Sequence, residues 1–408
     1  MKDDPRRISR RSFFKAAGAA GVGAAMVPLL KASDAAAAAP AAAGDLTLIP
    51  KRRFGRSGID VPMLALGGMF DIPSNQTLLK QAVRWGVTYW DTAHVYSGGH
   101  SEAGIGKYFQ SYPEQREKIF LVTKSTGRDP EDLGSDLATS LKRMNTDHID
   151  LFFVHGIRDA EVMDSRIRAW AAEQKAEGRI RLMGFSTHSN MERCLMDASR
   201  LDWIDGIMMT YNFRLMHEPQ MKDAVKACVD AGIGLTAMKT QGGGAVSTDS
   251  ARDLELAGRF IRKGFTDKQA KLKAVWENPQ ISALCSQMPT MSILMANIAA
   301  AVDRTSLSEN DRRHLEDYAG ETFNGYCAGC THICEGALAS AVPVGKVMRY
   351  LMYDRTYGDT HDARARFASI SAEIRQRMHR IDYAAAEARC PRRLPIARLM
   401  AEAAAQLG

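Results

Sequence analysis

The sequence has few cysteines, no strong excess of one charge and no long hydrophobic run. Seven cysteines among 408 residues are too few for a disulfide framework. No segment approaches roughly 18 uninterrupted apolar residues, so we expect no stable insertion into a membrane. The composition, 45% hydrophobic and 25% charged, is that of a globular protein, and it excludes collagen-like, coiled-coil and wholly disordered chains.

The net charge of +7 is concentrated at the N-terminus. Residues 1–43 hold seven basic and three acidic side chains, a net charge of +4, which leaves about +3 for the rest of the chain. A basic nucleic-acid-binding surface is therefore not expected, and we predict no nucleic-acid partner.

The N-terminal segment has the features of an export signal. Ser9-Arg10-Arg11-Ser12-Phe13-Phe14-Lys15 resembles the twin-arginine motif, and a short Ala/Gly-rich apolar run and an Ala-rich stretch follow it. Such a signal is an address that a receptor recognises, not a membrane anchor. We predict that residues 1–43 are a twin-arginine signal peptide and that the protein is exported to the periplasm. The alternative is a disordered tail that happens to contain an arginine pair.

From residue 46 onward, short apolar runs alternate with longer amphipathic stretches, which predicts strands that alternate with helices. The expected strands are 63–67, 88–91, 119–123, 149–155, 180–186, 207–211, 233–239 and 281–287. The expected helices between them are 76–85, 131–144, 160–177, 191–201 and 220–231. Eight such units favour an α/β fold of the (β/α)₈ TIM-barrel type over residues 44–305. A doubly wound open sheet is the alternative, but Leu66-Gly67-Gly68-Met69 lacks the glycine spacing that a Rossmann sheet requires.

Four residues with acid–base chemistry fall at the ends of three successive predicted strands. They are Asp91, Tyr96, Lys124 and His155. Chemistry in such barrels is located at the carboxyl ends of the strands, so we expect these four side chains to form an active site.

The same segments resemble the aldo-keto reductase superfamily. The resemblance rests on Phe54-Gly55-Arg56-Ser57-Gly58, Trp90-Asp91-Thr92-Ala93 with Tyr96, Ser101-Glu102-Ala103-Gly104-Ile105-Gly106, Thr123-Lys124-Ser125, Phe153-Val154-His155, Gly184-Phe185-Ser186, Tyr211-Asn212 and Ala296-Asn297-Ile298. It implies an oxidoreductase that acts on a small-molecule carbonyl or alcohol. Tyr96 is then the general acid, Lys124 lowers the pKa of Tyr96, Asp91 holds Lys124, and His155 orients the carbonyl oxygen.

The resemblance also implies positions for a nicotinamide cofactor, NAD(P)H. These positions correspond to Ser186, Thr187, Met208, Met238 and Asn297. Family members commonly have asparagine where Thr187 stands, glutamine where Met208 stands and an aromatic residue where Met238 stands. Methionine cannot replace the hydrogen bonds of an amide. The loop 286–291 has no basic residue for the 2′-phosphate of NADPH. We therefore expect a weakened nicotinamide site.

The segment 306–408 contains four of the seven cysteines. Cys327, Cys330 and Cys334 have the spacing C-x2-C-x3-C, and Cys390 precedes a proline. The segment resembles the ferredoxin-like C-terminal extension of some bacterial aldo-keto reductases, which implies one [4Fe–4S] cluster on these four cysteines. Structural zinc and disulfides are the alternatives. We expect helices between Cys334 and Cys390, including one over 363–381, with Tyr350, Tyr353 and Tyr357 either shielding the cluster or in ordinary helix packing.

Two classes of function follow. The first is an exported carbonyl/alcohol oxidoreductase with an iron–sulfur extension that draws electrons from a redox partner protein, because nicotinamide pools are cytoplasmic. The second is an electron-transfer or binding protein on the same barrel, without nicotinamide-dependent hydride transfer. A purely structural metalloprotein does not explain the four strand-end residues.

Overall fold

The structure, a computed structural model, describes residues 49–246, 266–339 and 341–408. The predicted signal peptide, residues 1–43, lies outside the described residues. In the part of the chain that is described, no helix is long and apolar enough to cross a membrane.

Eight parallel strands close into a barrel in the order β10-β3-β4-β5-β6-β7-β8-β9. Their bounds are β3 Leu64–Gly67, β4 Tyr89–Asp91, β5 Phe120–Ser125, β6 Ile149–Ile157, β7 Ile180–Thr187, β8 Gly206–Thr210, β9 Gly234–Met238 and β10 Ala283–Gln287. Each predicted strand is present to within about two residues at its ends. The predicted (β/α)₈ barrel is therefore confirmed, and the alternative of an open sheet is wrong because β10 pairs with β3.

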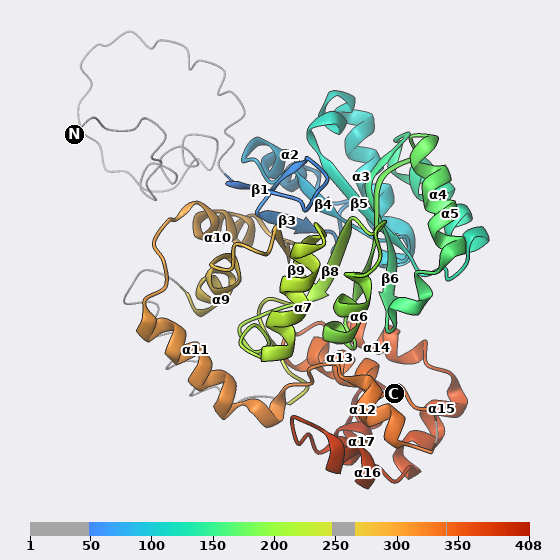
Figure 1. Cartoon of the computed structure of the whole chain (residues 1–408), viewed down its shortest axis with the longest axis vertical. Helices are drawn as coiled ribbons and strands as arrows, with labels where there is room; N and C mark the ends of the chain where they lie inside the picture. Colours follow the sequence, from blue (N-terminus) through green and yellow to red (C-terminus); the bar gives the residue numbers. More distant parts are fainter. Residues whose placement is uncertain (1–48, 247–265, 340) are drawn as a thin grey trace.

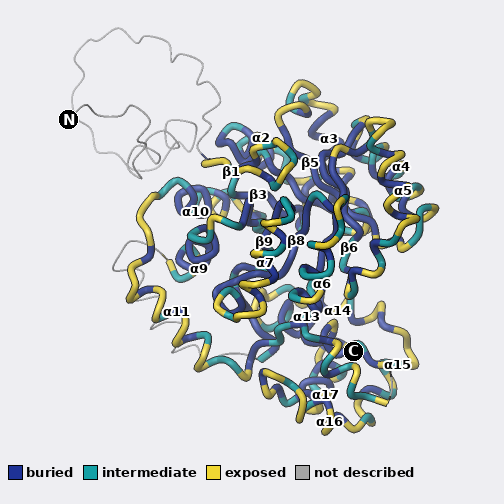
Figure 2. Tube along the Cα trace, in the orientation of Figure 1, coloured by how far each residue is buried: buried dark blue, intermediate teal, exposed yellow. Residues whose placement is uncertain are grey.

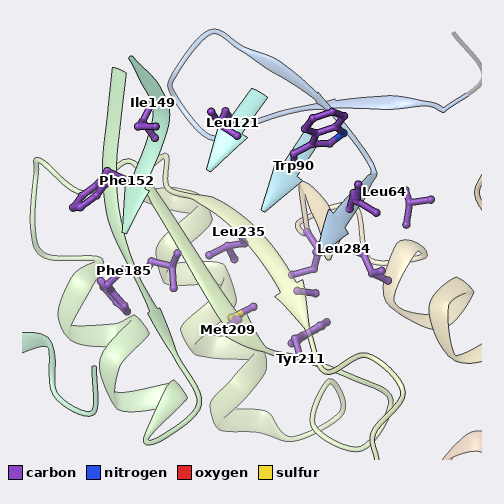
Figure 3. Packing of buried hydrophobic residues seen from close by; sticks show 14 of the residues in the cluster. Leu64, Trp90, Leu121, Ile149, Phe152, Phe185, Met209, Tyr211, Leu235 and Leu284 are labelled. Carbon is purple, nitrogen blue, oxygen red and sulfur yellow. The ribbon is translucent and has the colours of Figure 1, made fainter. Parts of the chain in front are cut away.

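The barrel strands are buried on both faces, which is why they are apolar runs in the sequence. The outward layer packs against the helices and includes Leu64, Trp90 and Phe152 (Figure 3). The inward layer fills the barrel with bulky side chains such as Tyr89, Phe153 and Met208.

A hairpin of β1 Lys51–Arg53 and β2 Asp60–Pro62 closes one end of the barrel. The ring of Phe54, in the turn, is fully buried and lies against Gly206 and Gly234. A Cβ at Gly206 would lie 2.7 Å from this ring, and one at Gly234 would lie 2.6 Å from it. These two strands therefore start with glycine because the Phe54 ring takes the space of a side chain.

The helices around the barrel are α2 Gln76–Arg84, α3 His100–Ser111, α4 Pro130–Met144, α5 Ser165–Ala176, α6 Met191–Ala198, α7 Pro219–Asp230, α9 Asp267–Trp276 and α10 Met291–Val302, with short 3₁₀ turns η1 Tyr96–Gly99, η2 Pro113–Lys118 and η3 Ala160–Val162. One expectation, a continuous helix over 160–177, is wrong. Asp164 caps the start of α5 by accepting hydrogen bonds from the N–H groups of Arg166 and Ile167, and this separates α5 from η3.

The C-terminal segment is helical and lies at one end of the barrel, where it is drawn in orange to red in Figure 1. Its elements are α11 Glu309–Glu321, η4 Phe323–Gly325, α12 Thr331–Cys334, η5 Glu335–Ala337, α13 Val344–Arg355, α14 Thr360–Ala368, α15 Ala372–Arg377, η6 Met378–Arg380, α16 Ala384–Arg389 and α17 Ile396–Leu407. The expected helix over 363–381 is broken, because Ser371 caps the start of α15. Figure 2 shows that α13 is largely buried, whereas α11 is exposed along much of its length.

Hydrogen bonds and close backbone contacts hold this segment on the barrel. Asn190, after β7, accepts hydrogen bonds at Oδ1 from the Thr331 hydroxyl and the His332 N–H, at 3.2 and 3.1 Å. Gly329, at φ +80°, approaches the His188 carbonyl so closely that a Cβ would lie 2.3 Å from that oxygen. The segment is therefore fitted to the carboxyl ends of the strands.

Candidate active site

The four predicted catalytic residues lie at one end of the barrel. Asp91 ends β4, Tyr96 begins η1, Lys124 lies near the end of β5 and His155 near the end of β6. Parallel strands of a barrel end on the same side, so residues 64 positions apart in the sequence become neighbours.

Asp91 and Lys124 form a buried ion pair. The Lys124 Nζ lies 2.7 Å from Asp91 Oδ1 and donates hydrogen bonds to Asp91 Oδ2 and to the Thr92 carbonyl at 2.8 and 2.6 Å. The side chains are 1% and 4% exposed. Burial lowers the pKa of Lys124, but the charges of Asp91 and Tyr96 and the hydrogen bond to Asp91 together outweigh burial, and the net pKa is raised. The lysine is thus held as a cation.

Tyr96 lies between this ion pair and His155. The Lys124 Nζ is 5.0 Å from the centre of the Tyr96 ring, and the Tyr96 and His155 rings meet edge to face at 5.7 Å. Burial raises the pKa of Tyr96 to about 12, although the charge of Lys124 acts in the opposite direction. The net shift is opposite to the expected lowering because desolvation of the phenolate exceeds the attraction of the lysine.

His155 is a neutral imidazole. Burial, and then the charges of Lys124 and of nearby arginines, hold its pKa well below the usual range. Its Nδ1 is buried and has no hydrogen-bond partner in the described part of the chain. His155 lines the cavity described below, and the N–H of a neutral imidazole can donate a hydrogen bond to a substrate oxygen there.

A cavity of about 500 Å³ opens in front of these residues. Asp91, Tyr96 and His155 line it from the barrel. The C-terminal segment supplies the opposite wall through Lys346, Arg349, Tyr353, Tyr357 and Arg366. This volume is in the range that small ligands occupy.

Of the five predicted nicotinamide residues, only Met208 and Met238 line the cavity. The Ser186 hydroxyl accepts a hydrogen bond from the Gly156 N–H, and the Thr187 hydroxyl donates to the carbonyls of Ile157 and Ser189.

Asn297, in α10, donates to the Ser286 hydroxyl at 3.0 Å and does not line the cavity. The structure therefore gathers only part of the predicted cofactor set.

The four C-terminal cysteines converge on one small cavity. Cys330 immediately precedes α12 and Cys334 ends it, while Cys327 lies in the loop before it and Cys390 follows α16. All seven cysteines of the chain are free thiols. The other groups around the four sulfurs are mostly apolar, with Val344, Met348, Leu394 and Ile396 among them. Among the described residues, no group of three or more His, Cys, Asp or Glu is placed to hold a single metal ion.

We call the cavity of about 500 Å³ in front of Tyr96 the barrel cavity, and the small cavity lined by the four cysteines the cysteine cavity. A third, narrow cavity lies between them. It shares His188, Lys239 and Arg349 with the barrel cavity. It shares Cys327, Ala328 and Met348 with the cysteine cavity. The third cavity therefore adjoins both of the others, and the shared lining includes Met348 and Arg349, which are consecutive residues of α13.

Several cavity residues were not predicted from the sequence. Lys239 directly follows β9, and the rule that located Lys124 at a strand end applies to it equally. Arg349 and Arg366 belong to helices whose place over the barrel no local pattern indicates. Tyr353 and Tyr357 line the barrel cavity and not the cysteine cavity, and Tyr350 packs in the core of the C-terminal segment.

Comparison with known proteins agrees with this arrangement. The sequence model described as "Aldo/keto reductase family" matches residues 64–302, which is more than half of the chain. Aldo-keto reductase AMT2 of Alternaria alternata is 26% identical over 230 residues, which cover 45% of this chain and 62% of that protein. The uncharacterized oxidoreductase YrpG of Bacillus subtilis is 26% identical over 321 residues, which cover 67% of this chain and 98% of that protein.

Solved structures share the fold. The thermostable aldo-keto reductase Tm1743, in complex with the inhibitor epalrestat, superposes with a TM-score of 0.55 at 25% identity and covers 66% of this chain and 99% of that one. The aldo-keto reductase AKR11C1 from Bacillus halodurans superposes with a TM-score of 0.53 at 22% identity, over 66% and 96% of the two chains. The chain accordingly belongs to the Aldo/keto reductase family and is an oxidoreductase of the aldo-keto reductase type.

Proposed function

We propose that the protein interconverts a carbonyl compound and its alcohol, with Tyr96 as general acid in the direction of reduction. The observation that carries the proposal is the arrangement of Tyr96 in the cavity wall, with the Lys124–Asp91 ion pair behind its ring and His155 beside it. Reduction of a carbonyl consumes two electrons and two protons, and Tyr96 supplies the proton that reaches the oxygen. His155 holds that oxygen by a hydrogen bond.

The raised pKa of Tyr96 keeps the phenol protonated but makes it a weaker acid, an effect that the charge of Lys124 offsets in part. With a pKa of about 12, the phenol is protonated throughout the physiological range and is always ready to donate. Lys124 then stabilises the phenolate that remains after the proton leaves, and Asp91 keeps Lys124 in position. The test is turnover of aldehydes by the purified full chain. Tyr96→Phe should lose activity, whereas Tyr112→Phe should retain it, because Tyr112 directly follows α3 and does not line the cavity.

The nicotinamide positions do not fit the amide of NAD(P)H well. Thr187 is committed to two backbone carbonyls, and Met208 has no group that hydrogen-bonds an amide strongly. This observation favours the alternative function, an electron-transfer or binding protein without nicotinamide-dependent hydride transfer. Turnover of an aldehyde by the purified protein discriminates between the two functions, because only the first converts a carbonyl compound. Binding of NADH and NADPH then shows whether either can serve as a free substrate.

We propose that Cys327, Cys330, Cys334 and Cys390 hold a [4Fe–4S] cluster. Their convergence on one largely apolar cavity supports this. Structural zinc is the alternative, and metal analysis separates the two because only the cluster contains iron. The cluster, when bound, supplies one-electron chemistry. Iron content after anaerobic purification tests the assignment: Cys390→Ser lowers it, whereas Cys228→Ser, at a buried thiol of α7, does not.

We further propose that the protein is exported by the twin-arginine route and receives electrons from a redox partner protein in the periplasm, two for each carbonyl reduced. The third cavity, which shares lining residues with both the cysteine cavity and the barrel cavity, supports this route. Turnover with a reduced ferredoxin-like donor, lost in Cys330→Ser, is the expected result. Rapid turnover with free NADPH alone, unaffected by Cys330→Ser, contradicts it.

A further inference from the structure

The barrel cavity is lined by an excess of cations. Arg128, Lys239, Lys346, Arg349 and Arg366 reach it from loops after β5 and β9 and from α13 and α14. Among the described residues, Asp91 is the only carboxylate in its lining, and Asp91 is already held by Lys124. A low-dielectric cavity with this balance attracts anions.

Two of these cations already have hydrogen-bond or ion-pair partners within the protein. The Arg128 guanidinium donates to the carbonyls of Thr126, Gly127 and His155, and the Arg366 Nε lies 2.5 Å from Asp362 Oδ2.

The remaining cations are not paired with a carboxylate. Lys239 and Arg349 are half-buried, and neither forms a salt bridge within the described ranges. Lys239 lies 4.3 Å above the ring of Tyr353, and Lys346 is exposed at the rim.

The neighbouring side chains respond to this positive field. Burial first, and then the charges of Arg349 and Lys239, hold the pKa of His188 well below the usual range. Burial raises the pKa of Tyr353, but the charges of Lys239, Arg349 and Arg366, together with a hydrogen bond to Lys239, outweigh burial and the net pKa is lowered. A phenol whose pKa falls despite burial lies in a field that favours a negative group at that point.

Unpaired cations in a partly closed cavity cost desolvation free energy, which a bound anion recovers. An arginine presents two parallel N–H groups to a carboxylate or phosphate, and a lysine adds a point charge. We propose that Arg349 and Lys239 form an anion-binding subsite that holds the carboxylate or phosphate group of the substrate while its carbonyl lies at Tyr96. The proposal rests on the proposed function and adds the substrate class, which is an anionic carbonyl compound.

Binding without turnover tests the subsite. The probes are malonate and inorganic phosphate, with malonamide as the neutral analogue of malonate, titrated calorimetrically into the anaerobically purified full chain. Wild type binds the two anions and not malonamide. Arg349→Gln and Lys239→Met each weaken anion binding about tenfold or more, since each removes a charge-assisted hydrogen bond.

Arg364→Gln is the matched control, because Arg364 is an exposed arginine of α14 that does not line the cavity. It binds both anions as wild type does. Unchanged affinity in both Arg349→Gln and Lys239→Met, or equal binding of malonamide, overturns the proposal. Lys239→Met, on the barrel, remains informative if Arg349→Gln disturbs the packing of α13.

A second arm separates the two sources of the anionic group, the substrate and the phosphates of a nucleotide cofactor. Saturating NADPH leaves malonate binding unchanged if the subsite serves the substrate, whereas competition between NADPH and malonate overturns that assignment. Tyr96→Phe separates the subsite from the proposed function. Tyr96→Phe should keep the malonate affinity of wild type, because the phenol is not part of the subsite. Full aldehyde turnover by Tyr96→Phe would refute Tyr96 as the general acid but would not affect the evidence for the anion-binding subsite.

Discussion

Tyr96→Phe removes one oxygen atom from the cavity and leaves every other contact of the ring in place. The edge-to-face contact with His155 and the 5.0 Å approach of the Lys124 Nζ involve the ring and not the hydroxyl. No hydrogen bond of the hydroxyl contributes to the pKa of Tyr96. The free energy of unfolding should therefore change by about 0.5 kcal/mol or less.

The effect on rate is expected to be far larger. A positioned general acid contributes about 10²–10⁴-fold to a proton transfer, which corresponds to roughly 2.7–5.4 kcal/mol of activation free energy. We therefore expect carbonyl reduction to fall by that factor in Tyr96→Phe while its thermal unfolding overlays that of wild type.

Tyr353→Phe is the control, because Tyr353 is a second phenol in the wall of the same cavity and has a lysine, Lys239, beside it. Aldehyde turnover and thermal unfolding are measured for both variants. Turnover is expected to survive in Tyr353→Phe. If Tyr96→Phe kept wild-type turnover while Tyr353→Phe lost it, the acid would be Tyr353 and the assignment of Tyr96 would be refuted.

Three further predictions concern pH, a buried ion pair and the contact between the two halves of the chain. The pKa of Tyr96 is about 12, and alcohol oxidation needs the phenolate, so the rate of oxidation should rise about tenfold per pH unit from about pH 7 to 11. The rate of carbonyl reduction should not respond to the titration of Tyr96. A plateau in the rate of oxidation near pH 8 would contradict that pKa. Asp150→Asn breaks the buried ion pair with Arg116, whose charged atoms lie 3.0 Å apart at the end of the barrel away from the cavity. Denaturant titration should show a free energy of unfolding lower by about 3–5 kcal/mol. Turnover per folded molecule should not change. Gly329 has φ +80°, and a Cβ added there would lie 2.3 Å from the His188 carbonyl oxygen, so Gly329→Ala should lower the free energy of unfolding by about 1–3 kcal/mol. Gly336→Ala should leave that free energy unchanged, because nothing lies within 4 Å of the added Cβ.

The barrel was predictable because its signal is local. A strand buried on both faces is an apolar run, and residues 149–155 or 233–239 carry that pattern without reference to any other segment. The breaks in the helices were missed because they depend on single caps. Asp164 and Ser371 each satisfy backbone N–H groups at a helix start, and the amphipathic period continues through both positions.

The active-site residues on the barrel were predictable for the same reason, since Asp91, Lys124 and His155 each follow an apolar run. The wall across the cavity was not. Arg349 lies on the cavity only because α13 packs over the strand ends, and that packing depends on contacts such as Asn190 with Thr331, 141 residues apart. No periodicity within α13 indicates which face meets the barrel.

The order of residues along α13 links the two cavities. Met348 lines the cysteine cavity and Arg349 lines the barrel cavity, so one turn of this helix belongs to both. The helix itself is held by packing in the core of the C-terminal segment, to which Val347, Met348 and Leu351 contribute. Met348 therefore connects the lining of the cysteine cavity to the helix that presents Arg349 to the barrel cavity. Together with Tyr353 and Arg366, Arg349 makes the C-terminal segment one wall of the barrel cavity, so the barrel alone does not enclose it.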